Sequence, residues 1–186
     1  MATVRTGNRS VLLVVDFQVR VVALSWDAAR IGANVARAVE LARAQGVPVI
    51  WVQHENADMP HGSPPWQIVP GLQPADGELR VYKRFDSAFE ETPLEHELAR
   101  LGATHIVLAG AMSSWCIRTA AYATLERGYD LTLVSDAHTT CDIERDNASP
   151  VPAEGIVADL NLAMTWLDYP GRKSATATAQ ELVFAR

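Results

Sequence analysis

Three residues that follow strand-like or small-residue segments of this sequence carry side chains suited to covalent catalysis. Asp16 and Lys83 each end a strand-like run, and Cys116 follows a stretch of small residues that leads into a helical pattern. A thiol attacks carbonyl carbons, a carboxylate can accept its proton, and an ammonium keeps the carboxylate ionised while favouring the thiolate. If the three segments converge, they predict nucleophilic acyl chemistry. Taken singly, the same residues are more typical of an exposed charge or a packed small side chain.

The position of Cys116 strengthens the interpretation as a nucleophile. A helix expected over 114–127 places the thiol at its first turn, where unpaired N–H groups and a partial positive charge stabilise a thiolate. The same N–H groups can hold the oxyanion that forms when the sulfur attacks a carbonyl. We therefore expect a cysteine whose ionised form is favoured. The alternative is a small buried hydrophobe between a strand and a helix.

The elements that must position these residues alternate between strands and helices along the chain. We expect one domain over 1–186, with a three-layer α/β/α fold and a mainly parallel, doubly wound six-stranded sheet in the order 3-2-1-4-5-6. Ligands bind beyond the carboxyl ends of such strands where the strand order reverses, so Asp16 and Cys116 should face each other there. The expected strands cover 10–16, 47–53, 79–83, 104–110, 130–136 and an edge strand within 173–182, and the expected helices cover 27–46, 92–102, 114–127 and 153–167.

Three segments resemble, in order and spacing, the signature blocks of the isochorismatase-like cysteine hydrolases: "VLLVVDFQ", "VYKRFDSAF" and "HIVLAGAMSSWCIRTAAYATLERGYDLTLVSDAHTT". The resemblance implies that Asp16, Lys83 and Cys116 form a catalytic triad that cleaves an amide-type C–N bond through a cysteine thioester. It also implies a cis peptide between Ala111 and Met112. The N–H groups of Met112 and Cys116 would then form the oxyanion hole.

The loop after the second expected strand bears on metal binding. Nicotinamidases of this superfamily bind a metal there through an Asp-x-His pattern, but Trp51 stands where the aspartate would be. The segment instead resembles the metal-free branch of the family, so we expect no metal and no cofactor, and nicotinamidase activity is disfavoured. His54, Asp58 and His61 are the alternative zinc ligands, and hydrogen-bonded loop histidines are the favoured interpretation.

Other functions remain open beside the amide hydrolase. An isochorismatase-type enol-ether hydrolase would use Asp16 and Lys83 without the thiol, and a catalytically silent binding protein would use none of the three. Cys116 favours carbonyl chemistry, and the intact set argues against a silent protein. A redox role shared by Cys116 and Cys141 is a fourth hypothesis, and Cys141 is interpreted as incidental.

The substrate is expected to be a small molecule held by side chains near the triad. Loops longer than about 12–15 residues are usually functional or disordered, and the long loop at 55–78 contains one candidate aromatic residue. The expected binding residues are Phe17, Gln18, His54, Trp66, Phe89 and Trp115. For each tryptophan, a packing or subunit-interface role is the alternative.

The composition and net charge of the chain limit the classes of partner that it is expected to bind. The 186 residues carry a net charge of −6 and no cluster of Lys and Arg, which disfavours nucleic acid. The apolar run near the N-terminus is too short for a membrane span, and two distant cysteines form no disulfide framework, so we expect a cytoplasmic protein. The family resemblance implies a homo-oligomer, a dimer or tetramer. An apolar stripe could supply its interface or pack on the sheet: Ile156, Leu160, Met164 and Leu167.

Overall fold

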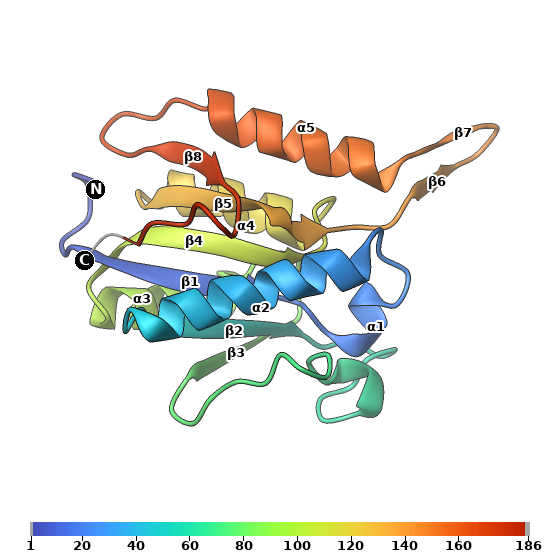
Figure 1. The fold of residues 1–186 in the computed structure, drawn as a ribbon, viewed down its shortest axis with the longest axis horizontal. Coiled ribbons are helices and arrows are strands. Elements are labelled where there is room, and N and C mark those ends of the chain that lie inside the picture. Colours follow the sequence, from blue (N-terminus) through green and yellow to red (C-terminus); the bar gives the residue numbers. More distant parts are fainter. Residues whose placement is uncertain (1, 185–186) are drawn as a thin grey trace.

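A six-stranded sheet lies at the centre of the molecule, and every strand pair in it is parallel. The computed structural model describes residues 2–184 (Figure 1). The elements are β1 (Arg9–Val15), α1 (Val19–Val22), α2 (Ala28–Ala44), β2 (Val49–His54), the 3-10 helix η1 (Pro64–Trp66), β3 (Leu79–Lys83), α3 (Leu94–Arg100), β4 (Ala103–Ala111), α4 (Cys116–Glu126), β5 (Asp130–Thr139), β6 (Ile143–Arg145), β7 (Ala148–Val151), α5 (Ala153–Trp166) and β8 (Ser174–Ala177).

The strand order is β3-β2-β1-β4-β5-β8. This is the order predicted from the sequence, with β8 as the sixth strand at the edge, so the prediction of a doubly wound α/β/α fold is confirmed. Strands β1 and β4 are neighbours, and the order reverses between them. The carboxyl ends of these two strands therefore meet at the place where such sheets bind ligands.

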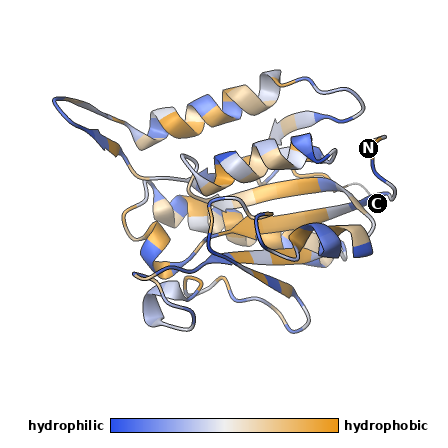
Figure 2. Ribbon diagram, turned by 180° about the vertical axis from the view of Figure 1, so that it is seen from behind, coloured by the Kyte–Doolittle hydropathy of each residue, from blue (hydrophilic) through white to orange (hydrophobic). Residues whose placement is uncertain are grey.

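Helices cover both faces of the sheet, which is why its central strands are continuous apolar runs. Along β1, Leu12 and Val14 belong to the core under α2, whereas Val11, Leu13 and Val15 belong to the core shared with α3, α4 and α5. Strand β4 is buried along its whole length. Figure 2 shows the central strands as the most hydrophobic part of the chain.

The apolar stripe of α5 packs inward. Leu160 and Met164 are fully buried in the core beside the sheet, and Ile156 is also buried. The stripe therefore docks the helix on the sheet. Leu162 and Trp166 are instead exposed on the outer side of α5. The expected homo-oligomer stays a prediction.

Two parts of the chain differ from the sequence expectations. Strand β5 continues beyond the expected 130–136 to Thr139, and an unpredicted antiparallel hairpin, β6–β7, projects from the body between β5 and α5 (Figure 1). Within the long loop at 55–78, η1 and a bridge from Ile68 to Gln18 fix the chain against α1. No helix within residues 2–184 has the length and apolar character needed to cross a membrane.

Candidate active site

The end of β4 lies against the end of β1 because residue 110 is glycine. Gly110 pairs with Val15 across the two strands. A Cβ atom at Gly110 would lie 2.0 Å from the Val15 carbonyl oxygen, and the glycine has a φ of +128°, where other residues are strained. Immediately beyond it, the peptide between Ala111 and Met112 is cis, as the family resemblance implies. The end of β1 and the start of α4 are thereby held side by side.

Asp16, Lys83 and Cys116 meet at this point although they come from three separate segments. Lys83 Nζ lies 2.7 Å from Asp16 Oδ2 and 3.2 Å from Cys116 Sγ. The side chains of Asp16 and Lys83 are almost completely buried. The second oxygen of Asp16, Oδ1, is also buried and receives no hydrogen bond of regular geometry from residues 2–184. The ammonium therefore bridges the carboxylate and the sulfur.

Lys83 is held by two further groups. Its Nζ donates to the Phe85 carbonyl oxygen at 3.1 Å and approaches His54 Nδ1 at 3.3 Å. Burial lowers the pKa of Lys83, but the charge of Asp16 and the hydrogen bonds to Asp16 and Cys116 outweigh it and raise the pKa above its ordinary value. The lysine is consequently a fixed cation. Burial and the Lys83 charge lower the pKa of His54, so its ring is neutral and accepts from the ammonium.

The Cys116 thiol differs from the expected thiolate. Burial raises the pKa of Cys116 most strongly, and the charge of Asp16 raises it further, while Lys83 opposes both and is outweighed. The resting sulfur is therefore protonated at neutral pH. The helix terminus and the ammonium favour a thiolate. The cost of burying a charged sulfur beside a carboxylate is larger, and it could not be included from the sequence alone.

Two backbone N–H groups beside the sulfur are free to bind an oxyanion. Neither Met112 nor Cys116 donates a hydrogen bond to another residue in the described part of the chain. The carbonyl of Met112 instead accepts from Trp115 and Ile117, and the Ser113 N–H donates to Thr139 at 2.8 Å. These bonds fix the turn, and its unpaired donors are of the type that stabilises a tetrahedral intermediate.

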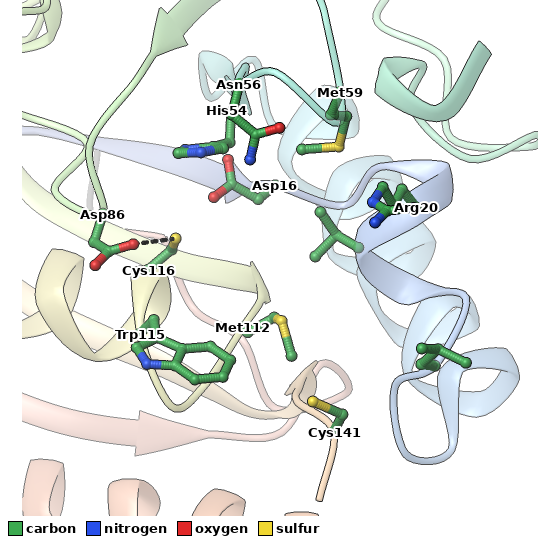
Figure 3. Close-up of a pocket in the computed structure, with 12 residues that line it drawn as sticks. Asp16, Arg20, His54, Asn56, Met59, Asp86, Met112, Trp115, Cys116 and Cys141 are labelled. Carbon is green, nitrogen blue, oxygen red and sulfur yellow. Dashed lines mark hydrogen bonds between the residues drawn. The ribbon is translucent and has the colours of Figure 1, made fainter. Parts of the chain in front are cut away.

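A pocket of about 360 Å³ opens above the sulfur (Figure 3). It joins the triad to the surface and is large enough for a small molecule. Its lining residues are Asp16, Arg20, Val21, Leu24, His54, Asn56, Met59, Asp86, Met112, Trp115, Cys116 and Cys141.

Two of the six expected binding residues, His54 and Trp115, line this pocket. Phe17 and Phe89 do not. Phe17 is buried in the core under α2, on the face of the sheet away from α4. Phe89 is buried in the core on the other face, with the Arg127 guanidinium 4.7 Å from its ring centroid. Each of the two aromatic residues comes shortly after a site residue in the sequence, Phe17 after Asp16 and Phe89 after Lys83. The side chain of each is nevertheless buried in the core.

Gln18 contacts the site through the backbone of His54, whereas Trp66 lies outside the pocket. Gln18 is fully buried, donates from Nε2 to the His54 and Trp66 carbonyl oxygens, and accepts from the His54 N–H. It thus positions His54 and the long loop. Trp66 stacks near His61 and Tyr82, with ring centroids at 4.3 and 5.5 Å, and is outside the pocket lining.

The alternative zinc ligands do not gather. His54 Nδ1 faces Lys83, whereas His61 Nδ1 lies 3.2 Å from a Glu55 carboxylate oxygen and Asp58 is exposed in the loop. Within residues 2–184, no three His, Cys, Asp or Glu side chains are placed to hold a metal ion together.

Several residues of the pocket were not predicted from the sequence. Arg20 belongs to a short helix that no apolar periodicity indicates, and Asn56 and Met59 belong to an irregular loop. Asp86 was within reach of sequence reasoning, because it lies three residues after Lys83 in the quoted block "VYKRFDSAF". Cys141, interpreted as incidental, also lines the pocket.

Comparisons with known proteins find relatives of this chain in sequence and in fold. The chain matches the family described as the Isochorismatase domain over residues 10–159. It is 34% identical over 140 residues to the streptothricin hydrolase of Streptomyces noursei, covering 71% of this chain and 55% of that protein. The ureidoacrylate amidohydrolase RutB of Methylobacterium radiotolerans is 28% identical over 138 residues, covering 56% and 53%. The matches thus span about half the length of these two relatives.

A solved structure extends the likeness to nearly the whole chain. The crystal structure of an isochorismatase from Pseudomonas putida KT2440 superposes with a TM-score of 0.81 and 28% sequence identity. The superposition covers 94% of this chain and 90% of that one. The fold of this chain therefore recurs in that solved structure.

Proposed function

Because this chain belongs to the isochorismatase family, we propose that it is a cysteine hydrolase that cleaves an amide-type C–N bond of a small molecule. Cys116 is the nucleophile, Asp16 is the proton acceptor and donor, and Lys83 is the fixed cation between them. The name of the relative RutB, an amidohydrolase, supports C–N cleavage.

One observation carries this proposal. The ammonium of Lys83 lies within 3.2 Å of the Cys116 sulfur and within 2.7 Å of the Asp16 carboxylate, at the floor of an open pocket. A structural ion pair has no need of a thiol beside it or of a path to solvent. An enzyme that forms a thioester needs both.

The proton movement follows from the protonated resting thiol. As the sulfur of Cys116 bonds to the substrate carbonyl carbon, its proton passes to Asp16, and the Met112 and Cys116 N–H groups bind the resulting oxyanion. The C–N bond then breaks, and Asp16 returns the proton to the leaving nitrogen. A thioester remains on Cys116.

Hydrolysis of the thioester uses the same groups in reverse. Water gives a proton to Asp16 as its oxygen bonds to the acyl carbon, and the C–S bond breaks. The sulfur recovers the proton and the acid product leaves. Lys83 stays protonated throughout, because its raised pKa opposes proton loss, and it stabilises both the Asp16 carboxylate and the developing sulfur charge.

The test compares a panel of small amides with isochorismate, using the wild type and the Cys116→Ala variant. The proposal expects amide turnover by the wild type, and loss of at least about 10³-fold in kcat/KM when the nucleophile is removed. Isochorismate cleavage that persists in Cys116→Ala, without amide turnover by either protein, would instead assign the enol-ether reaction that needs only Asp16 and Lys83.

A further inference from the structure

A carboxylate and an aromatic ring stand beside the nucleophile without a part in the proposed reaction. Asp86 Oδ1 lies 3.8 Å from Cys116 Sγ, and the thiol is oriented to donate to it. Trp115 directly precedes Cys116 and leaves 45% of its surface exposed, unusual for so large an aromatic residue. Both line the pocket, and Figure 3 draws the sulfur between the Asp86 and Asp16 carboxylates with the Trp115 ring next to it.

The charge on Asp86 is available to a ligand. The Asp16 carboxylate is paired with Lys83 at 2.7 Å, and His54 is neutral because burial and Lys83 lower its pKa. No Lys or Arg side chain within residues 2–184 lies at ion-pair distance from Asp86. The pocket therefore has an uncompensated negative charge at its nucleophile end.

The proposed reaction fixes which part of the substrate reaches this charge. In the tetrahedral intermediate, the oxyanion points to the Met112 N–H and the leaving nitrogen points to Asp16. The remaining substituent of the carbonyl carbon must point away from both groups. Asp86 lies on the opposite side of the sulfur from Asp16, and the Trp115 ring lies below the sulfur in the same view (Figure 3).

We propose that the Asp86 carboxylate and the Trp115 indole form a cation subsite, which binds an ammonium or guanidinium group on the acyl part of the substrate close to the scissile carbonyl. A carboxylate attracts such a cation, and an exposed indole face adds a cation–π contact. Arg20 lines the other end of the pocket and repels a cation there. The assignment of the acyl part rests on the proposed function, whereas the presence of the subsite does not.

The experiment measures how fast charged reagents label Cys116, with no need for amidase turnover. The probes are methyl methanethiosulfonate, its trimethylammonium-ethyl analogue and its sulfonatoethyl analogue, which are neutral, cationic and anionic. In each case the cysteine sulfur bonds to the reagent's sulfur and displaces methanesulfinate, so no oxidant is required. Peptide mass mapping separates labelling of Cys116 from labelling of Cys141.

The predicted result is a preference for the cationic over the anionic reagent, each taken relative to the neutral one. This preference should fall about three- to tenfold in Asp86→Asn and fade at high salt. Glu90→Gln is the matched control, because it removes an exposed carboxylate from the same loop but outside the pocket, and it should keep the preference. Trp115→Leu should lose part of the preference and Trp115→Phe should retain more of it.

A matched pair of amides extends the test to turnover. Glycinamide carries an ammonium where propionamide carries a methyl group, and Asp86→Asn should lower kcat/KM for glycinamide while leaving kcat/KM for propionamide unchanged.

An equal loss of kcat/KM on both amides would assign Asp86 to water or thiol activation and overturn the subsite. Equal labelling preferences in Asp86→Asn and Glu90→Gln would also overturn it. Labelling that depends on Asp86, with no amide hydrolysed and no acyl adduct formed, would retain the subsite and reject the proposed function.

Discussion

The ammonium nitrogen of Lys83 lies 3.2 Å from the sulfur of Cys116, although Lys83 ends an edge strand and Cys116 begins a helix that follows β4. Strands β2 and β1 lie between β3 and β4 in the sheet. The Lys83 side chain extends toward the carboxyl end of β1, where its ammonium contacts both Asp16 and the sulfur. This contact lowers the thiol pKa, but burial and the Asp16 charge raise it by more.

Asp16→Asn should have opposite effects on two reactions of Cys116. Because the Asp16 charge raises the pKa of the thiol, its removal lowers that pKa and shifts the pH profile of alkylation by iodoacetamide to lower pH. Amide turnover should fall by at least about 10²-fold, since the proton acceptor is lost. The measurement is the alkylation rate of Cys116 from pH 6 to about 10, followed by peptide mass mapping.

The matched comparison is Lys83→Met. Lys83 lowers the pKa of the thiol, so this variant should shift the alkylation profile to higher pH. Shifts of both variants in the same direction would contradict the electrostatic account of the site.

Lys83→Met should also destabilise the fold. It leaves the buried Asp16 carboxylate without its partner at 2.7 Å, and the loss of one partner of a buried pair costs about 3–5 kcal/mol. Urea unfolding at pH 7 measures the free energy. Arg100→Met is the control, because it removes a partner of the exposed Arg100–Glu97 pair and should cost about 1 kcal/mol or less. Equal losses in the two variants would show that Asp16 is solvated.

Gly110→Ala should unfold the turn that holds the nucleophile. The added Cβ would lie 2.0 Å from the Val15 carbonyl oxygen, and the positive φ adds strain. We expect a loss of more than about 1 kcal/mol in urea unfolding, together with a loss of amide turnover. Gly155→Ala is the control. It lies in α5 with nothing within 4 Å of the added Cβ, and it should stabilise the protein by about 0.5–1 kcal/mol.

Stability should fall as the pH drops below neutrality because of His138. Its ring is fully buried, accepts from Ser113 at Nδ1 and donates from Nε2 to Asn161. Burial lowers the pKa of His138 from 6.5 to about 4. The unfolded chain therefore binds the proton first, and stability present above pH 6.5 is lost as the pH falls toward 4, by on the order of 3 kcal/mol.

Urea unfolding between pH 7 and 4 checks this dependence. His138→Gln should flatten it, whatever the variant's absolute stability, whereas the same change at His96, exposed on α3, should leave the slope as it is. An unchanged slope in His138→Gln would contradict the assignment. Burial also lowers the pKa of His105 and His54, so part of the slope should remain.

The sequence predicted the sheet and the convergence of the triad for the same reason. In a parallel doubly wound sheet, the carboxyl ends of all strands meet at one edge, so residues that end apolar runs, such as Asp16 and Lys83, must lie near one another. The hairpin β6–β7 escaped prediction because the segment from Ile143 to Val151 is rich in charge and has no apolar alternation. Its pairing depends on a turn rather than on a buried face.

The pocket walls were harder to predict because adjacent residues turn to opposite faces. Phe17 follows Asp16 directly but enters the core under α2, while Trp115, next to Cys116, remains at the pocket. The protonation of the thiol could not be predicted either, since it depends on how deeply the sulfur lies beside Asp16. The order of strands along the sequence predicts which residues lie close together. The depth at which the Cys116 sulfur is buried is known only from the structure.

The most direct test of the central claim is the intact mass of the protein quenched during turnover of a slowly hydrolysed amide. The account predicts a mass increase equal to the acyl group, located on the Cys116 peptide, absent in Cys116→Ala and retained in Cys141→Ser. Full amide turnover by Cys116→Ala, with no adduct on the wild type, would show that the reaction does not pass through this sulfur.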